Sequence, residues 1–275
     1  MPADDHPELT RQDLFGRGYS DAPSDLPYDD RLYASQLLMA LSSSPLPWAG
    51  NAAFHLVGFS LGGALTASFA AYFPHMLRSL TLVCPGGLIR PNHLSLRSRF
   101  LYSEGLLPQG LLRWLLLRRL QPDQGPSADV PDKVDRDVDF DNVRLVSGAR
   151  VGDVMKWQLR GNEGLAWAYR STIRSAPIYG EHNGLWKRLE RVLSARRQAS
   201  GTVPPGLPGG KICLILADKD PVVVASEWVA DVAAVLGEDA ADIRIVDGGH
   251  EIAIAKGEEV AGLAMASWNQ DYVHA

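Results

Sequence analysis

Four short stretches rich in apolar residues divide the chain, and each is followed within a few residues by glycine or aspartate. They lie at residues 54–59, 77–85, 211–217 and 242–246. Continuous apolar runs of this length are typical of strands that are buried on both faces of a parallel sheet. Helical spacing follows three of them, at residues 64–73, 222–236 and 252–272. This alternation predicts an α/β fold, in which helices cover both faces of a mostly parallel sheet.

The long segment between the second and third strands breaks this alternation. It contains helical patterns but no convincing strand, and an acidic loop lies at residues 123–141. The helical patterns lie at 106–120, 151–169 and 185–197. Because the segment lies between two strands of one sheet, we expect it to be a helical insertion. The expected parts are a first core part at 1–87, the helical insertion at 88–205 and a second core part at 206–275.

Composition and charge narrow the classes of function. The 275 residues carry a formal net charge of −5, without the basic face that nucleic-acid binding requires. Cys84 and Cys213 both lie in apolar runs, so we interpret them as buried strand residues and not as a disulfide or metal ligands. No apolar run approaches the 18 residues of a transmembrane segment, and the acidic N-terminus does not resemble a secretory signal. These features predict a cytoplasmic protein.

A serine boxed by glycines is the first candidate for chemistry. Ser60 lies in Gly-Phe-Ser-Leu-Gly-Gly, residues 58–63, between a predicted strand and a predicted helix. A bare Gly-x-Ser-x-Gly motif is weak evidence, but this context is the one that a nucleophilic serine on a strained strand-to-helix turn requires. We expect glycine at positions 58 and 62 because a Cβ at either would collide across that turn.

The residues around this serine resemble those of the α/β-hydrolase superfamily. GFSLGG is similar to the family's nucleophile elbow, and DLFGRGYSDAP at 13–23 is similar to its Asp-x-x-Gly-x-Gly-x-Ser segment. The resemblance covers residues 13–90 and 208–252, and the insertion occupies the position of the family's variable cap. It implies an α/β-hydrolase fold, abbreviated at its N-terminus, with a helical cap.

The resemblance also implies a base and an acid that follow the serine in the order Ser, Asp or Glu, His. Of seven histidines, only His250 follows a predicted sheet strand near the end of the chain, so we expect it to be the base. Asp218 and Asp220 are both candidates for the acid after the preceding strand, and the family pattern assigns Asp220. Pro85 occupies the alternative acid position of some relatives and removes that rival.

The activity that the resemblance implies is acyl transfer by a serine hydrolase, without metal or organic cofactor. The substrate class is a small or medium apolar carboxylic ester, a thioester, an amide, or a carbon–carbon bond beside a carbonyl. The backbone N–H of Leu61 is expected to be one oxyanion donor. Aromatic side chains are expected to line the substrate site; the alternative is that those in the cap only form its core. They are Phe59 beside the serine and Trp114, Trp157, Trp167 and Trp186 in the cap.

The residues before Asp13 differ from the family's pattern. Twelve residues replace its first three strands, the His-Gly loop that supplies a second oxyanion donor, and a fourth strand. We expect a shortened gene model or splice form of a normal hydrolase; the alternatives are a diverged member with a rebuilt N-terminus and an inactive fragment that only binds. Losing one donor costs about 10²–10³ in rate unless another group substitutes. The same loss would leave one edge of the sheet uncovered, and pairing of such edges is one way in which a homo-oligomer could form.

Overall fold

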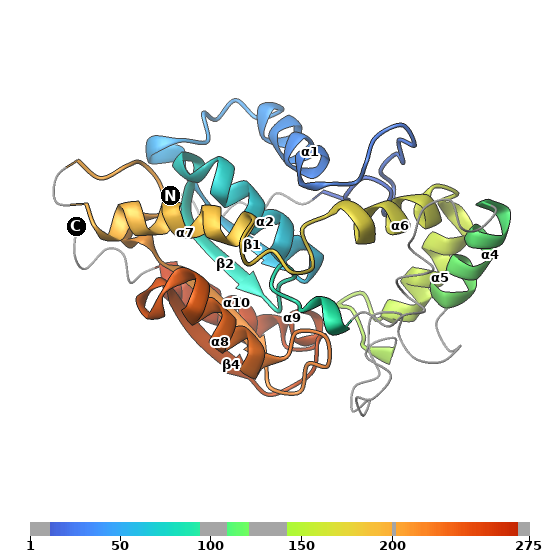
Figure 1. Ribbon diagram of the computed structural model, residues 1–275. Helices are drawn as coiled ribbons and strands as arrows, with labels where there is room; N and C mark the ends of the chain where they lie inside the picture. Colours follow the sequence, from blue (N-terminus) through green and yellow to red (C-terminus); the bar gives the residue numbers. More distant parts are fainter. Residues whose placement is uncertain (1–11, 94–108, 121–141, 200–201, 269–275) are drawn as a thin grey trace, which may run out of the picture.

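The four apolar runs form the four strands of one parallel sheet (Figure 1). The computed structural model describes residues 12–93, 109–120, 142–199 and 202–268. The strands are β1 (Phe54–Phe59), β2 (Leu77–Val83), β3 (Ile212–Ala217) and β4 (Ala241–Val246). They lie side by side in the order β1-β2-β3-β4, and all three pairs are parallel. The predicted parallel α/β sheet is confirmed.

Helices cover both faces of this sheet. A row of three, α2 (Leu61–Tyr72), α7 (Leu185–Arg197) and α8 (Ala225–Leu236), covers one face. The other face carries α10 (Gly257–Trp268), which packs on β2 and β3 after the short α9 (Ile252–Ala255). In addition, α1 (Asp30–Ser42) packs against α2. Within the described residues, short 3-10 helices lie at Gly50–Ala52, Pro74–Met76, Pro91–His93, Pro208–Gly210 and Glu238–Ala240.

Helix α7 packs differently from the expectation that its residues belong to the insertion. Leu189 and Leu193 are fully buried in the main core, and Trp186 lies against Trp228 of α8 with ring centroids 5.3 Å apart. Trp186 has no exposed surface, so the expectation that it lines the substrate site as a cap residue is wrong. The reason is that α7 is the crossover helix between β2 and β3, and its apolar side must cover the sheet.

Three helices of the insertion form a group of their own. They are α4 (Gln109–Leu120), α5 (Val151–Gly161) and α6 (Leu165–Ser175), which pack against one another and stand together at one end of the molecule (Figure 1). Leu112, Leu116 and Ala166 form a small core that is separate from the main one. The acidic loop expected at 123–141 lies outside the described residues. In the described parts of the chain, no helix combines the length and apolar character that crossing a membrane requires.

The DLFGRGYSDAP segment joins this helical group to the core. A Cβ on Gly16 would lie 2.1 Å from the Cβ of Ala168 in α6, so only glycine allows this approach. The backbone N–H of Gly18 donates a hydrogen bond to Gln158 of α5 at 2.9 Å. The ring of Tyr19 lies edge-on to Trp157, with centroids 4.9 Å apart. The segment therefore fixes α5 and α6 beside the sheet.

The segments that lead into and out of the insertion lie side by side and are hydrogen-bonded to each other. Ile89 and Tyr179 form a parallel bridge, and the backbone N–H of Gly180 donates to the carbonyl of Ile89 at 3.0 Å. Arg90 then makes a bidentate ion pair with Asp231 of α8, at 3.0 and 3.1 Å. These contacts anchor the base of the insertion to the helix layer of the core.

Strand β1 is the outermost strand on its side of the sheet among the described residues. Its residues are less buried than those of β2 and β3, and the side chain of Val57 is 47% exposed. His55 of β1 stacks on Trp268 of α10, with ring centroids 4.3 Å apart. The histidine inside this strand therefore packs on the helix that covers the second face.

The glycines of the turn between β1 and α2 differ in what they require. A Cβ on Gly58 would lie 2.2 Å from Thr66 Oγ1 and 2.4 Å from the carbonyl oxygen of Gly62. No atom beyond the helix's own backbone lies within 4 Å of a Cβ built on Gly62, so the expected collision at position 62 is wrong. Position 63 has the close approach instead, because a Cβ on Gly63 would lie 2.4 Å from the Cβ of Pro85.

We predict opposite effects on stability for two alanine substitutions in this turn. Gly58→Ala should lower the free energy of unfolding by about 2 kcal/mol, because the new methyl group meets backbone and a buried hydroxyl. Gly62→Ala, the matched control, should be neutral or stabilising by up to about 1 kcal/mol, because alanine favours the helix. Denaturant unfolding measures both, and equal destabilisation by the two substitutions would contradict this account of the turn.

Candidate functional site

Ser60 lies on a sharp turn between the end of β1 and the start of α2. Its backbone has φ 52° and ψ −118°, which a residue with a side chain rarely adopts. The Ser60 N–H donates to the carbonyl of Val83 at 3.0 Å, and the Gly86 N–H donates to the Ser60 carbonyl at 2.9 Å. These bonds to the end of β2 hold the strained turn and direct the hydroxyl to the carboxyl edge of the sheet.

His250 reaches the same edge from the loop between β4 and α9. A hydrogen bond of 2.8 Å joins its Nε2 to Ser60 Oγ. Gly248 in this loop has φ +142°, and its N–H donates to Asp218 Oδ1 at 2.9 Å. The Gly249 N–H donates to Glu251 at 3.2 Å. The loop is therefore held from both sides, and the imidazole is placed beside the serine.

Asp220 completes a continuous chain of hydrogen bonds. Its Oδ2 lies 2.6 Å from Nδ1 of His250, and its side chain has no exposed surface. The other oxygen, Oδ1, accepts the backbone N–H groups of Val222 and Val223, both at 2.8 Å. A buried carboxylate is stable when its oxygens are satisfied in this way. The structure thus brings together the serine, the histidine and the acid that the sequence suggested.

The rival acid, Asp218, has a different environment. It is exposed, and its Oδ1 accepts the N–H of Gly248. Its own N–H donates to the carbonyl of Val246 at 3.0 Å. Asp218 therefore supports the loop that carries the histidine, while only Asp220 reaches the ring.

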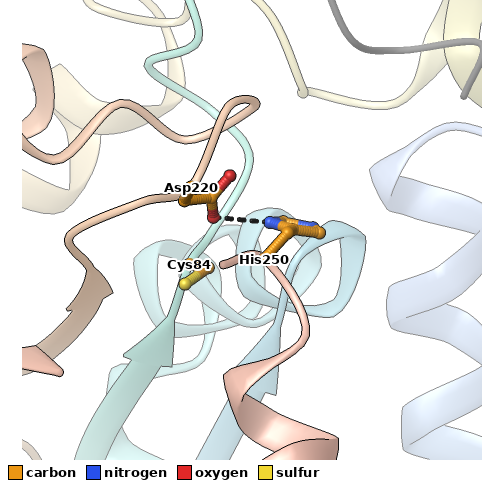
Figure 2. A group of neighbouring side chains, drawn as sticks. All are labelled: Cys84, Asp220 and His250. Atoms are coloured by element: carbon orange, nitrogen blue, oxygen red, sulfur yellow. Dashed lines mark hydrogen bonds and ion pairs between the residues drawn. The ribbon is translucent and has the colours of Figure 1, made fainter. Parts of the chain in front are cut away.

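Cys84 is a member of the site that the sequence did not suggest. Its Sγ, a carboxylate oxygen of Asp220 and a ring nitrogen of His250 all lie within 4.8 Å of one another (Figure 2). Burial, with Asp220 nearby, raises the pKa of the Cys84 thiol. We expected Pro85 at the alternative acid position after this strand, but β2 ends at Val83 and the residue that comes near Asp220 is Cys84. A cysteine directly after a buried strand was the available signal.

These three side chains are of kinds that could hold a metal ion. A metal ion binds the thiolate form of cysteine, and the raised pKa of Cys84 favours the protonated thiol. The oxygen and nitrogen that a metal would need are also joined in the hydrogen bond between Asp220 and His250. The arrangement therefore fits proton transfer better than metal binding.

Leu61 and Phe59 flank the serine as their sequence positions require. Leu61 is the first residue of α2, so its N–H belongs to the first-turn amides that have no acceptor within the helix. The ring of Phe59 is half-buried, and its centroid lies 5.2 Å from that of His250. Phe59 thus contacts the imidazole, and its expected contact with substrate stays a prediction.

The three cap tryptophans lie on the surface of the helical group. Trp114, Trp157 and Trp167 are 53%, 42% and 37% exposed. The guanidinium of Arg118 lies 5.5 Å from the ring centroid of Trp114, and Tyr19 packs against Trp157. Each therefore presents part of its ring at the surface, where an apolar ligand could contact it. Their assignment to substrate binding stays a prediction.

A family model and related proteins assign this chain to the same family. Residues 10–256 match the family model described as the alpha/beta hydrolase fold. The chain is 45% identical over 58 residues to monoacylglycerol lipase abhd6-A of Xenopus laevis, and 57% identical over 35 residues to the human monoacylglycerol lipase ABHD6. These stretches cover 21% and 13% of this chain and only 16% and 10% of those relatives.

Solved structures share the fold at low sequence identity. The hydrolase MGS-M2 from a Medee basin deep-sea metagenome library has a TM-score of 0.58 at 13% identity, over 94% of this chain and 78% of that one. A bacterial membrane phospholipase A has a TM-score of 0.56 at 16% identity, over 96% and 70%. With the family model matched over most of the sequence, the chain belongs to the α/β-hydrolase fold family.

Proposed function

We propose that this protein is a serine hydrolase that cleaves a small or medium apolar carboxylic ester, or a related thioester or amide, through an acyl-enzyme. The observation that carries the proposal is the continuous chain of hydrogen bonds from Ser60 through His250 to Asp220. A serine hydroxyl is a weak nucleophile alone and needs an adjacent base, and the base needs a group that orients it. All three are present at one edge of the sheet.

In the first half-reaction, Nε2 of His250 takes the proton of Ser60 as Oγ bonds to the substrate carbonyl carbon. The carbonyl π electrons move to oxygen and form a tetrahedral oxyanion. When they return, the bond to the leaving alcohol breaks, and the alcohol leaves with the proton from His250. In the second half-reaction, His250 takes a proton from water, and the water oxygen bonds to the carbonyl carbon of the acyl-enzyme. The bond from that carbon to Ser60 Oγ then breaks, Oγ takes the proton back from His250, and the carboxylic acid is released.

Asp220 acts by fixing the imidazole. With Oδ1 held by two backbone amides, Oδ2 can accept a hydrogen bond from the N–H at Nδ1 of His250. This leaves Nε2 free to accept the proton of Ser60. The buried negative charge also stabilises the imidazolium that forms in each half-reaction.

The backbone N–H of Leu61 is placed to donate a hydrogen bond to the oxyanion. It follows the nucleophile at the start of α2, where the helix N-terminus also favours developing negative charge. Removing an oxyanion-hole donor typically costs about 10²–10³ in rate. Covalent labelling of Ser60 tests the nucleophile directly.

Two observations support an apolar ester as substrate. The relatives with matching segments are monoacylglycerol lipases, so we propose an ester with an apolar acyl group for this chain as well. Trp114, Trp157 and Trp167 offer apolar surface on the helical group, where such an acyl chain could lie. The alternative, a catalytically impaired binding protein of the same fold, predicts ligand binding that is insensitive to Ser60→Ala.

We predict that a fluorophosphonate probe labels this protein at Ser60. Ser60→Ala should abolish labelling, and His250→Ala should slow it by at least about a thousandfold, because the hydroxyl then has no base. Ser79→Ala is a matched control, since Ser79 also bonds a histidine, His55 Nδ1, at 2.8 Å, without a place in the chain to Asp220. Mass spectrometry of labelled peptides measures all four proteins. Folded wild-type protein that takes up no label would favour the binding protein.

A second prediction separates the two candidate acids. Asp220→Asn should lower the rate of labelling by about three to four powers of ten, because its amide group donates to Nδ1 and puts the ring proton on Nε2. Asp218→Asn should cost less than about tenfold, because asparagine can still accept the N–H of Gly248. The pair is compared by labelling rate at fixed pH, and equal losses would contradict the assignment of Asp220.

A further inference from the structure

A pocket lies between α1, α2 and α7, apart from the proposed triad. Its volume is about 390 Å³, within the range of pockets that bind small molecules. Tyr72, the last residue of α2, lines this pocket, whereas Ser60 comes directly before the first residue of the helix. Because α2 has 12 residues, the two positions lie about 18 Å apart along the helix axis. The pocket is therefore a site of its own and not an extension of the candidate active site.

Three cationic side chains of α7 line the pocket. They are Lys187, Arg188 and Arg191, and all of them are exposed. Arg188 and Arg191 are three positions apart, so they are neighbours on one face of the helix. The guanidinium of Arg188 lies over the ring of Tyr72, 4.7 Å from the ring centroid. Among the described residues, neither arginine is ion-paired with a carboxylate, so both keep N–H donors for an anionic ligand.

Two carboxylates line the same pocket, and the protein fixes one oxygen of each. Asp30 Oδ2 accepts the hydroxyl of Ser68 at 2.8 Å. Glu181 Oε2 accepts the backbone N–H of Leu185, the first residue of α7, at 3.1 Å. The second oxygen of each carboxylate is an acceptor for a hydroxyl group of a ligand. Three cations and two carboxylates in one pocket suit a ligand that carries both an anionic group and hydroxyl groups.

We propose that this pocket binds a small phosphate ester that carries hydroxyl groups, such as a polyol phosphate. Arg188 and Arg191 bind the phosphate group, because each planar guanidinium can donate two parallel hydrogen bonds to its oxygens. A phosphate ester offers three such oxygens and a carboxylate only two, so the phosphate satisfies two arginines better. Asp30 and Glu181 accept the hydroxyl hydrogens of the ester. The proposal does not depend on the hydrolase function, since no residue of the triad lines the pocket.

Isothermal titration calorimetry of the full chain tests the proposal with three probes: inorganic phosphate, glycerol 3-phosphate and glycerol. We expect glycerol 3-phosphate to bind at least about three times as tightly as inorganic phosphate, because its hydroxyl groups bond the carboxylates. Glycerol alone should give no measurable heat of binding. No heat with either phosphate compound would overturn the proposal, and equal affinities for the two would overturn a hydroxylated ester as the ligand.

Arg188→Gln combined with Arg191→Gln should lower the affinity for glycerol 3-phosphate at least about tenfold, since charge-assisted hydrogen bonds are lost. The matched control combines Arg113→Gln with Arg160→Gln, which removes two exposed arginines from α4 and α5 and should bind like the wild type. Equal losses in the two double variants would overturn the proposal. Arg191→Gln alone, which leaves Arg188 over Tyr72, should cost at least about threefold and covers the case in which the double variant does not fold. An unchanged affinity in Arg191→Gln would also overturn the proposal.

A final measurement identifies the source of the phosphate ester, which can be a free small molecule or the headgroup of a lipid. Vesicles of phosphatidylglycerol in phosphatidylcholine are sedimented with the wild type and with the double variant at Arg188 and Arg191. Vesicle binding that the variant loses, and for which glycerol 3-phosphate competes, assigns the lipid headgroup. Binding of glycerol 3-phosphate without vesicle binding assigns a free ester.

Discussion

The backbone of Ser60 is the point on which the site and the sheet both depend. Its N–H and carbonyl bond to Val83 and Gly86, which belong to the neighbouring strand and its following turn. The same turn brings Cys84 near the acid, and the pairing of β2 with β3 helps to place Asp220. A strained conformation that costs about 1–3 kcal/mol is held because the adjacent strand ends supply its partners. The pairing of neighbouring strands thus determines where the residues of the site lie.

The sheet could be predicted from the sequence because each strand is a short apolar run with a clear end. Helix α7 could not be assigned correctly, because its apolar positions fit a cap helix as well as a crossover helix. The burial of Leu189 and Leu193 in the main core and the packing of Trp186 on Trp228 distinguish the two. The break between α5 and α6 was also missed, since an unbroken helical pattern runs across Asn162 and Gly164.

The candidate site was predictable where chain order and turn residues carry the information. Ser60, Asp220 and His250 are separated by long stretches, yet each follows a strand that the pattern identifies. The nearness of Cys84 to Asp220 and His250 was not predictable, because it depends on how the chain turns after the strand ends. The requirement for glycine moved from position 62 to position 63 for a similar reason, since only Gly63 meets Pro85. Both details depend on side-chain direction, which spacing alone does not determine.

The separation of Ser60 and His250 by 190 positions has a consequence for how the chain folds. Strand β3, which must pair with β2, is synthesised only after the whole insertion. Until then the apolar edge of β2 has no partner, so the nascent chain depends on slow, long-range contacts and is open to wrong pairing. The entropic cost of closing a loop, in contrast, grows only slowly with the length of the loop. A longer insertion therefore changes the stability of the folded protein little, but it slows folding.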